Sequence, residues 1–333
     1  RCVHLHSGLK AAERKEALRM IASGEAQFIV GTHSCISDDV VYNRLGLVVL
    51  DEEHLFGVEQ KEAVKRKTKQ GLHTISMSAT PIPRTIAETF YGDSKQIISI
   101  KTKPAGRKEI RTSIHSYRNT VFQMMEREIL ATNRCYVVCP AIDAEDEEIT
   151  SIADIEGIYR AYFEPRGMRI GIVNGKQKQE ENNRIISDFA TGNIQVLIST
   201  TVIEVGVNVP EATVIVIEQA DRFGLASLHQ LRGRVGRSDR QSYCMLLSED
   251  TENSRLKVLE STNDGFLIAE ADMQQRGTGN LIGTEQSGYD RRMKEAVTHP
   301  EMFRKAKEAA AYCTKNGCGK RLMKIKSPKI QTS

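Results

Sequence analysis

Short apolar runs alternate with helical patterns along most of the chain and fall into two blocks. The runs are rich in Val and Ile, as is typical of strands buried in a parallel sheet. They cover 27–30, 47–50 and 73–77 in the first block, and 135–138, 168–173, 195–198 and 213–217 in the second. This alternation predicts an α/β fold with parallel sheets.

Two changes in composition divide the chain further. Residues 101–108 lie between the blocks and contain Pro104 and Gly106, which favours a hinge at that point. After about residue 264 the strand pattern stops, and a Gly-punctuated segment leads into helical, Lys-rich sequence. We therefore expect two α/β domains at 1–103 and 104–254, followed by a hairpin, a loop and a basic helical tail at 255–333.

Charge is distributed unevenly behind a small net value of +4. Residues 291–333 hold twelve Lys and Arg against three Asp and Glu, so the rest of the chain is net negative. Such a basic tail is suited to neutralising phosphates. A solvated chain end is an equally open alternative, because the tail lacks the interleaved aromatics of many single-strand binding surfaces.

Several classes of protein are disfavoured by the composition. No stretch approaches the roughly 18 apolar residues of a membrane helix, and the first residues lack the layout of a signal peptide. The seven cysteines are scattered without CxxC pairs, which favours reduced thiols over zinc ligands or disulfides. These features predict a cytoplasmic protein without a membrane partner.

Two adjacent acids follow the apolar run 47–50. Asp51 and Glu52 stand at the carboxyl end of a predicted strand, where open α/β sheets bind their ligands. Hydrolysis of a nucleoside triphosphate needs one carboxylate to hold magnesium, directly or through water, and a second to orient the attacking water. The pattern resembles a Walker B motif, and on that resemblance we assign Asp51 to the metal and Glu52 to the water. A strand that merely ends in a polar turn has the same pattern, so that alternative stays open.

A run of small hydroxyl residues closes the next predicted strand. Ser78 and Thr80 flank Ala79 and precede Pro81. Such hydroxyls can exchange hydrogen bonds as two domains close, which makes both candidates for coupling nucleotide state to domain movement. Thr80 before Pro81 is also a good helix start, and both interpretations can hold at once.

Three arginines are concentrated late in the second block, at positions 232, 234 and 237. Small or apolar residues separate them, and packing explains them poorly, because charges are seldom buried without partners. An arginine that reaches a γ-phosphate stabilises the charge of the transition state. We favour Arg234 and Arg237 for this role, and a solvated basic helix start is the alternative.

The order of these motifs resembles that of superfamily-two helicases. The acids at 51, the Ser-Ala-Thr turn at 78 and the arginines from 232 look like motifs II, III and VI, and STTVIEVGVNVP at 199–210 looks like motif V. The resemblance implies two RecA-like domains that use ATP and Mg²⁺. It implies catalytic residues Asp51, Glu52, His54, Gln230, Arg234 and Arg237, nucleotide-binding residues Gly206 and Asn208, and nucleic-acid contacts from Thr32 and Thr201.

A narrower resemblance, to the RecG family of DNA helicases, covers almost the whole chain. Its matching segments are GTHSCI, LDEEHLFGVEQ, MSATPIPRTIA and RFGLASLHQLRGRVGR, together with DGFLIAEADMQQRGTGNLIGTEQSG at 264–288. The last segment is similar to a motif shared with the transcription-repair coupling factor, a helical hairpin and loop that relays ATP hydrolysis to movement on duplex DNA. By position, Arg255, Arg276 and Gln286 would be its coupling residues.

The sequence departs from this family in two places. A Gly-rich loop with Lys and a hydroxyl, which cradles phosphates, is absent from it, and the run 171–177 has the wrong spacing. We therefore expect a C-terminal portion that lacks this loop and the upstream DNA-binding wedge domain, is inactive alone, and has a marginal first domain. Asn208 stands where the family usually has Asp, which puts one nucleotide or interdomain contact in doubt.

The resemblance implies a translocase that remodels stalled forks and Holliday junctions in recombination and repair. It would act as a monomer on branched or duplex DNA, with a single-strand DNA-binding protein as a further candidate partner. A transcription-repair coupling translocase is one alternative. A non-catalytic nucleic-acid-binding module is the other.

Overall fold

The structure, a computed structural model, describes 1–53, 56–67, 71–78, 96–100, 102, 106–140, 152–200, 209–276 and the single residues 305, 308, 309, 312 and 313. The chain divides into two compact units, Arg1–Ala79 and Thr80–Ser333. Within the described residues no helix is long and apolar enough to cross a membrane.

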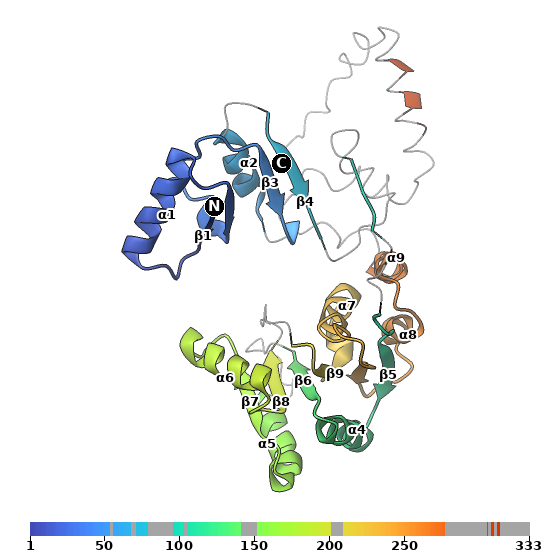
Figure 1. Cartoon of the computed structure of the whole chain (residues 1–333). Coiled ribbons are helices and arrows are strands. Elements are labelled where there is room, and N and C mark those ends of the chain that lie inside the picture. Colours follow the sequence, from blue (N-terminus) through green and yellow to red (C-terminus); the bar gives the residue numbers. More distant parts are fainter. Residues whose placement is uncertain are drawn as a thin grey trace, which may run out of the picture. The chain divides into compact units, whose positions relative to one another are not determined.

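Unit 1 contains two separate pairs of parallel strands among its described residues (Figure 1). One pair joins β1 (Cys2–Leu5) to β2 (Phe28–Gly31) through α1 (Ala11–Ser23). The other joins β3 (Leu47–Leu50) to β4 (His73–Ser76) through α2 (Val58–Arg66). Each pair is a strand, a helix and a parallel strand, which is the arrangement that the alternation in the sequence predicts.

A small core holds the first pair together. Val3 and Leu5 point from β1 to one side and pack with Ala17 and Ile21 of α1 and with Val40. Lys67 ties the second pair to this core, because its Nζ donates to the carbonyl oxygens of Ser37 at 2.7 Å and Val40 at 2.9 Å. Unit 1 therefore has one covered side, and its apolar cluster is small.

The opposite side of the unit 1 strands is apolar and exposed. Val49 of β3 and Ile75 of β4 are register partners, and they are 51% and 49% exposed. Phe28 and Val30, which alternate along β2, are exposed as well. Parallel sheets are ordinarily covered on both faces, so the strands of unit 1 leave unburied the apolar surface that normally stabilises such a sheet.

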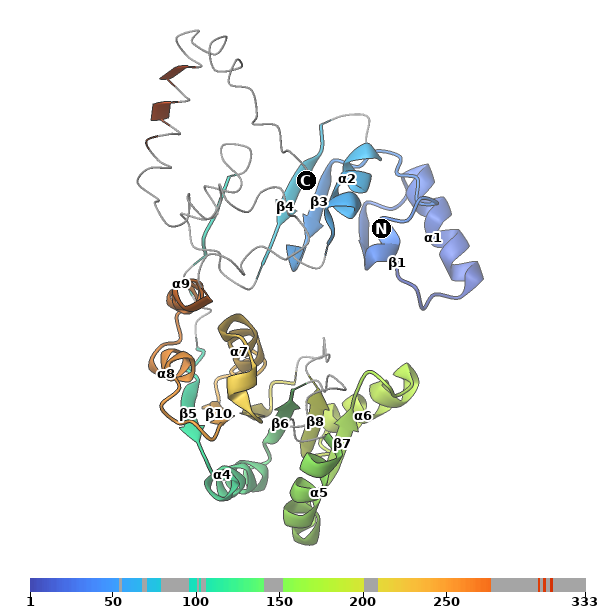
Figure 2. The ribbon, with the colours of Figure 1, turned by 180° about the vertical axis from the view of Figure 1, so that it is seen from behind.

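Unit 2 is built on a six-stranded parallel sheet formed by its described strands (Figure 2). The spatial order is β5-β10-β9-β6-β8-β7. These strands are β5 (Arg111–His115), β6 (Arg134–Cys139), β7 (Ile170–Val173), β8 (Val196–Thr200), β9 (Ala212–Ile217) and β10 (Tyr243–Leu247). The central strands β6, β8 and β9 are almost wholly buried, which explains their Val- and Ile-rich sequences.

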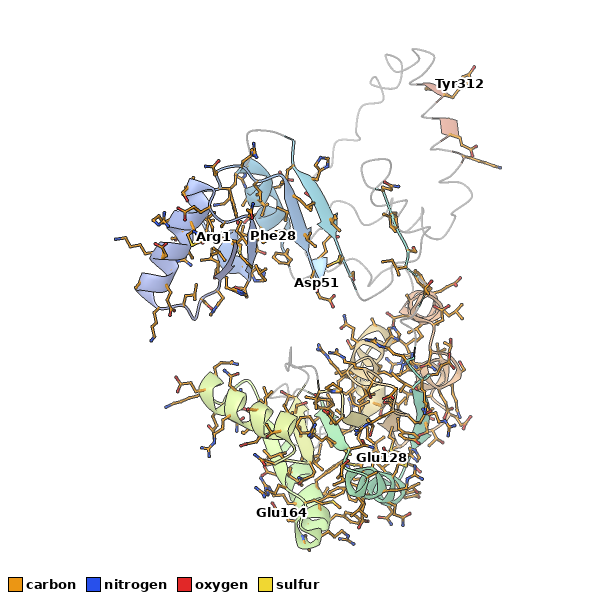
Figure 3. All side chains as sticks on the ribbon, in the orientation of Figure 1. Arg1, Phe28, Asp51, Glu128, Glu164 and Tyr312 are labelled. Atoms are coloured by element: carbon orange, nitrogen blue, oxygen red, sulfur yellow. The ribbon has the colours of Figure 1, made fainter. Side chains whose placement is uncertain are left out.

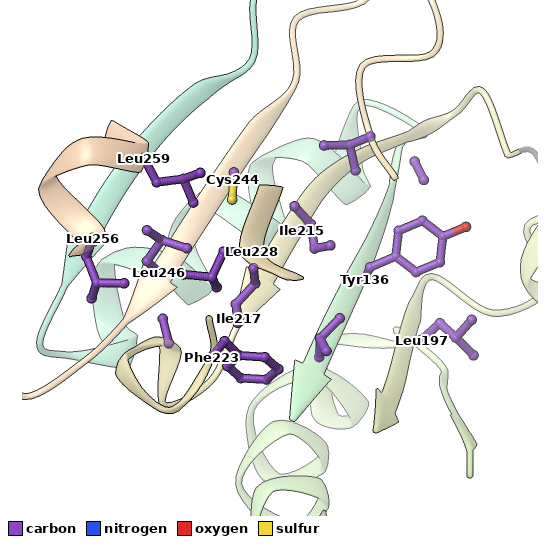
Figure 4. Close-up of a cluster of buried hydrophobic side chains, with 14 of the residues drawn as sticks. Tyr136, Leu197, Ile215, Ile217, Phe223, Leu228, Cys244, Leu246, Leu256 and Leu259 are labelled. Atoms are coloured by element: carbon purple, nitrogen blue, oxygen red, sulfur yellow. The ribbon is translucent and has the colours of Figure 1, made fainter. Parts of the chain in front are cut away.

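Helices cover both faces of this sheet. On one face α4 (Arg118–Leu130) and α5 (Ile152–Phe163) pack through a cluster that contains Phe122, Tyr159 and Phe163. The other face carries α6 (Gln179–Thr191), α7 (Leu225–Arg232), α8 (Ser254–Ser261) and α9 (Gly265–Arg276), whose core is drawn in Figure 4. The predicted α/β class with parallel sheets is confirmed.

The difference between the two sides of unit 1 leads to a prediction about matched Val→Thr substitutions. Val3 is 6% exposed and Val49 is 51% exposed, and both lie on strands of the same unit. Val3→Thr buries a hydroxyl and should cost about 1–3 kcal/mol of unfolding free energy, whereas Val49→Thr should stay within about 0.5 kcal/mol. Hydrogen exchange of unit 1 peptides across a urea series measures both. Equal destabilisation would show that Val49 is buried in solution.

Candidate functional site

The acidic motif lies where β3 leaves the sheet of unit 1. The backbone of Met77, after β4, donates to the Leu50 carbonyl at 2.7 Å, and Glu53 donates back to the Met77 carbonyl at 3.0 Å. Two segments far apart in sequence are thus joined directly beyond their strands. Asp51, labelled in Figure 3, and Ser78 both belong to this joined edge.

The turn at Glu52 changes the direction of the chain. Its φ of +50° is left-handed, which is uncommon for a residue with a side chain, and its amide donates to the Asp51 Oδ1 at 3.0 Å. Asp51 is exposed and Glu52 is half-buried. The two adjacent carboxylates therefore meet different surroundings, as separate roles in binding a metal and orienting water require.

The residues at this edge fit magnesium in one particular way. Within the described part of the chain, no group of three His, Cys, Asp or Glu side chains forms a metal cage. Magnesium in phosphoryl-transfer sites is commonly held by one or two carboxylates, with phosphate oxygens and water completing the octahedron. An exposed Asp51 beside Glu52 matches that mode of binding and does not match a site built from protein ligands alone.

The other predicted residues of unit 1 are partly accounted for. Thr32 is exposed and follows β2, and its amide donates to the Leu5 carbonyl at 3.2 Å. It therefore stands at the carboxyl end of a parallel strand, as Asp51 and Ser78 do. His54 and Thr80 lie outside the described residues.

The arginine segment begins on α7 and continues through a turn. Gln230 lies on α7 and is half-buried, as are Arg234 and Arg237 beyond it. Val235 between them is buried in the core, which anchors the turn to the sheet domain. Gly236 has a φ of +74°, a left-handed conformation that favours glycine, so the segment can turn between its two arginines.

Electrostatics make this segment a candidate anion site. Burial lowers the pKa of Arg237, and the neighbouring guanidinium groups of Arg234 and Arg107 lower it further. Burial also raises the pKa of Tyr136, beside these arginines, to about 12. Cations that are half-desolvated and repel one another are stabilised when an anion binds among them. The arrangement thus favours binding of an anion.

Arg232 corrects one sequence-based expectation. All three arginines were expected to resist explanation by packing, and for Arg232 this is wrong, because it is 2% exposed and hydrogen-bonded within the fold. The preference for Arg234 and Arg237 as the phosphate-facing pair stays a prediction.

The predicted coupling residues are only partly described. Arg255 lies on α8, and its Nη2 donates to the Asp221 carbonyl at 2.7 Å, in the short turn that precedes α7. It therefore connects the start of α8 to the entry of the arginine segment. Arg276 is the last residue of α9. Outside the described residues lie Gln286, Thr201, Gly206 and Asn208.

One buried charged cluster escaped the sequence interpretation. Glu218 follows β9 and is 1% exposed, and Arg118 binds its two carboxylate oxygens at 3.0 and 2.7 Å. The Tyr159 hydroxyl donates to the same carboxylate at 2.9 Å. The hydrogen bonds between Arg118 and Glu218 raise the pKa of Arg118, and the cluster holds α4, α5 and β9 together. An acid after a Val- and Ile-rich run was a visible signal, but its partner stands a hundred residues earlier.

The turn between the arginines allows a test with two neighbouring glycines. A Cβ at Gly236 would lie 2.8 Å from the Ile110 Cγ1, and the left-handed φ adds about 1–2 kcal/mol for any other residue. Gly236→Ala should therefore destabilise unit 2 by at least about 1 kcal/mol in urea unfolding followed by circular dichroism. Gly233, with a φ of −67° and its nearest such contact at 3.4 Å, is the control. Gly233→Ala should stay within about 0.5 kcal/mol, and equal losses would contradict the assigned turn.

Comparison with known proteins identifies three segments of the chain. Residues 2–89 match the DEAD/DEAH box helicase family, and residues 119–239 match the helicase conserved C-terminal domain. Residues 262–315 match the C-terminal part of domain 3 of the ATP-dependent DNA helicase RecG. The first match contains the acidic motif and the second contains the arginine segment.

Curated relatives agree with these matches. The chain is 40% identical to the RecG helicase of Bacillus subtilis over 290 residues, which cover 85% of this chain and 42% of that protein. It is 41% identical to the RecG helicase of Streptococcus pneumoniae over 315 residues, which cover 92% of this chain and 46% of that protein. The chain thus spans less than half the length of these relatives.

A solved structure gives the same assignment. RecG bound to a three-way DNA junction is 33% identical and superposes with a TM-score of 0.63, over 87% of this chain and 37% of that chain. The α/β units seen here therefore have the RecA-like helicase fold. On its sequence and its structure, the chain belongs to the RecG family of superfamily-two helicases.

Proposed function

We propose that this chain supplies the acidic and the arginine-bearing parts of a motor that hydrolyses ATP and remodels branched DNA. The observation that carries the proposal is the arginine segment, where half-buried cations gather beside Tyr136 in an arrangement that favours an anion. Its RecG relatives are named ATP-dependent DNA helicases, which supports ATP as the source of that anion.

In this proposal the acidic edge of unit 1 binds magnesium and positions water. Asp51 holds Mg²⁺, directly or through water, and the bound ion would neutralise charge on the phosphates. Glu52 orients the attacking water and accepts its proton, and His54 completes this edge. The hydrogen bonds between the exits of β3 and β4 support the assignment, because they fix Asp51 and Glu52 relative to Ser78.

The arginine segment stabilises the other end of the reaction. Arg234 and Arg237 bind the γ-phosphate as negative charge shifts during transfer, and Gln230 on α7 lies close enough in sequence to share the same ligand. Gly206 and Asn208 contact the nucleotide. The amide of Asn208 can still donate or accept a hydrogen bond, but it contributes no charge to magnesium or to an arginine.

The remaining candidates would connect hydrolysis to movement on DNA. Ser78 and Thr80 sense closure of the two domains, and Thr32 and Thr201 contact the DNA backbone. Arg255 supports the proposal through its hydrogen bond to the turn before α7, because it links the arginine segment to the helices that follow. Arg276 and Gln286 continue this connection.

We also propose the domain boundaries at 103/104 and 254/255. The three family matches, 2–89, 119–239 and 262–315, lie within the three regions that these boundaries define.

The motor would act as a monomer, because translocation needs only its own two RecA-like domains. Branched DNA is supported as the substrate by the relative solved on a three-way junction. We further propose that the protein acts in the cytoplasm, where bacterial DNA lies. A single-strand DNA-binding protein is its proposed partner.

The role of the arginine segment is tested by Arg237→Ala in the full-length protein. Loss of a guanidinium that stabilises transition-state charge should lower DNA-stimulated ATP hydrolysis at least about 10³-fold. Arg166→Ala is the control, because Arg166 is exposed and stacks on the Tyr162 ring at 3.9 Å, away from the arginine segment. Hydrolysis within about tenfold of the wild type in Arg237→Ala would remove Arg237 from the site.

Gln286 gives a separate test of coupling. Gln286→Ala in the full-length protein should leave DNA-stimulated hydrolysis within about threefold of the wild type while branch unwinding falls at least about tenfold, because a coupling residue does not touch the reacting atoms. Asp51→Asn serves as the reference, since it should reduce both activities together. Equal loss of both activities in Gln286→Ala would argue against a coupling role.

The wild-type full-length protein tests the alternative function. If it hydrolysed no ATP and its DNA binding did not change with ATP, the chain would be a non-catalytic binding module.

A further inference from the structure

A contact between two rings joins the separate strand pairs of unit 1. The ring centroids of His33 and Phe56 lie 4.7 Å apart, and the ring planes are inclined by 34°. His33 begins the short helical turn η1 (His33–Cys35) after β2, whereas Phe56 lies between β3 and α2. Rings at this separation attract each other beyond the apolar area that they bury. The contact therefore links two segments that share no strand ladder among the described residues.

Phe56 belongs to the turn that follows the acid pair. Its amide donates to the Glu53 carbonyl at 3.2 Å, and the Glu53 amide donates to the Met77 carbonyl at 3.0 Å. Glu52, directly before Glu53, has the left-handed φ of +50°. Few backbone conformations are open to a residue with a side chain in such a turn. A displacement of the Phe56 ring is therefore passed to the backbone that carries the Glu52 carboxylate.

His33 belongs to the turn that begins with Thr32. The Cys35 amide donates to the Thr32 carbonyl at 3.0 Å, and the Ile36 amide donates to the His33 carbonyl at 2.9 Å. The Tyr42 hydroxyl also holds this turn, because it donates to the Cys35 carbonyl at 2.9 Å. Thr32 and the His33 ring therefore move together, so a ligand that shifts Thr32 also shifts the ring.

The far end of the same loop is fixed by Lys67. Its ammonium donates to the carbonyl oxygens of Ser37 at 2.7 Å and Val40 at 2.9 Å. Lys67 follows α2 directly, so it holds the loop to the strand pair that also carries the acids. Because the loop is anchored beyond its first turn, it takes up little of a movement that starts at Thr32. The contact with Phe56 receives the rest.

We propose that His33 and Phe56 are positioning residues, through which DNA bound at Thr32 sets the position of the Glu52 carboxylate. Both act through the backbone, and neither is a catalytic residue. The link is reciprocal, because a ligand at the acidic edge that shifts Phe56 changes the affinity of the Thr32 turn for DNA by the same factor. The inference rests on the proposed function for the contact of Thr32 with DNA and for the role of Glu52.

The exposure of His33 permits a substitution that removes the ring alone. His33→Asn opens no cavity in the core, and Asn is well accepted in turns. His33→Phe is the matched variant, because it keeps an aromatic ring at the same position. Phe56→Leu removes the other ring. Tyr42→Phe is the control, because it removes a hydrogen bond to the same turn and leaves both rings in place.

The test is hydrogen–deuterium exchange of the full-length protein with and without a synthetic three-way DNA junction. In the wild type the junction should slow exchange of the amides of residues 32–36 and, through the ring contact, those of Glu53 and Phe56. In His33→Asn the protection of 32–36 should stay. The protection of Glu53 and Phe56 should fall about threefold to tenfold, the factor expected from loss of one aromatic pair. His33→Phe and Tyr42→Phe should match the wild type.

The outcomes separate the ring contact from the contact with DNA. Protection of 32–36 in the wild type without protection of Glu53 overturns the link and leaves the DNA contact intact. Equal protection of Glu53 in His33→Asn, Phe56→Leu and the wild type also overturns the link, because the rings then only stabilise the fold. Absence of protection at 32–36 overturns both the link and the proposed contact of Thr32 with DNA.

Hydrolysis gives a second measurement of the same link. In His33→Asn the stimulation of ATP hydrolysis by the junction should fall by about threefold to tenfold, while KM for ATP stays within about twofold. If the exchange pattern were found in a protein that hydrolyses no ATP, the ring contact would still link DNA to the acidic edge, and the assigned reaction would be wrong.

Discussion

Parallel strand pairing is the constraint on which the placement of chemistry in this molecule depends. Strands that run in the same direction bring their carboxyl ends to one edge, so residues from distant parts of the sequence become neighbours there. In unit 1 the backbone of Met77 joins the exits of β3 and β4, and in unit 2 the backbone amide of Glu218 donates to the Val138 carbonyl at 2.9 Å. Asp51 and Glu218 occupy equivalent positions, yet Asp51 is exposed and Glu218 is held by Arg118. The edge supplies the position, and the surroundings decide whether an acid stays exposed or is held within the fold.

The arginines of unit 2 also differ in their surroundings, because they are desolvated to different extents and by different neighbours. Arg118 and Arg232 are each satisfied within the fold, one by a carboxylate and the other by neutral carbonyls at a helix end. Arg234 and Arg237 are half-buried beside each other, and burial together with mutual repulsion lowers the pKa of Arg237. A bound phosphate would offset both the burial and the mutual repulsion of Arg234 and Arg237. At Arg118 and Arg232 it would instead displace acceptors that already satisfy the guanidinium groups. Neighbouring guanidinium groups lower the pKa of Arg237, whereas Arg118 pairs with a carboxylate, and this difference in electrostatic surroundings makes Arg237 the candidate for binding an anion.

The sequence predicted the Val- and Ile-rich strands better than the strands of other composition, for a physical reason. Each Val- and Ile-rich run became a strand, and Asp51 and Glu52 directly follow one of them, as expected. The missed strands β1, β5 and β10 either alternate with polar residues or are rich in Cys, Met and Leu, which have no strong strand preference. The long-range contacts of Arg232 and Glu218 could not be inferred, because they join residues 27 to 120 positions apart through the tertiary fold.

The proposed phosphoryl transfer would depend on positioning, and the two units differ in how their candidate residues are held. Unit 2 buries its sheet on both faces, and Val235 and Arg232 fix the arginine segment to that core before any ligand arrives. In unit 1 the acids stand on a pair of strands whose outer side chains, Val49 and Ile75, are half exposed. A sheet covered on one side resists bending less, because part of the apolar burial that would oppose the distortion is missing. Burial of that outer face would therefore stiffen the strands that position the acidic edge.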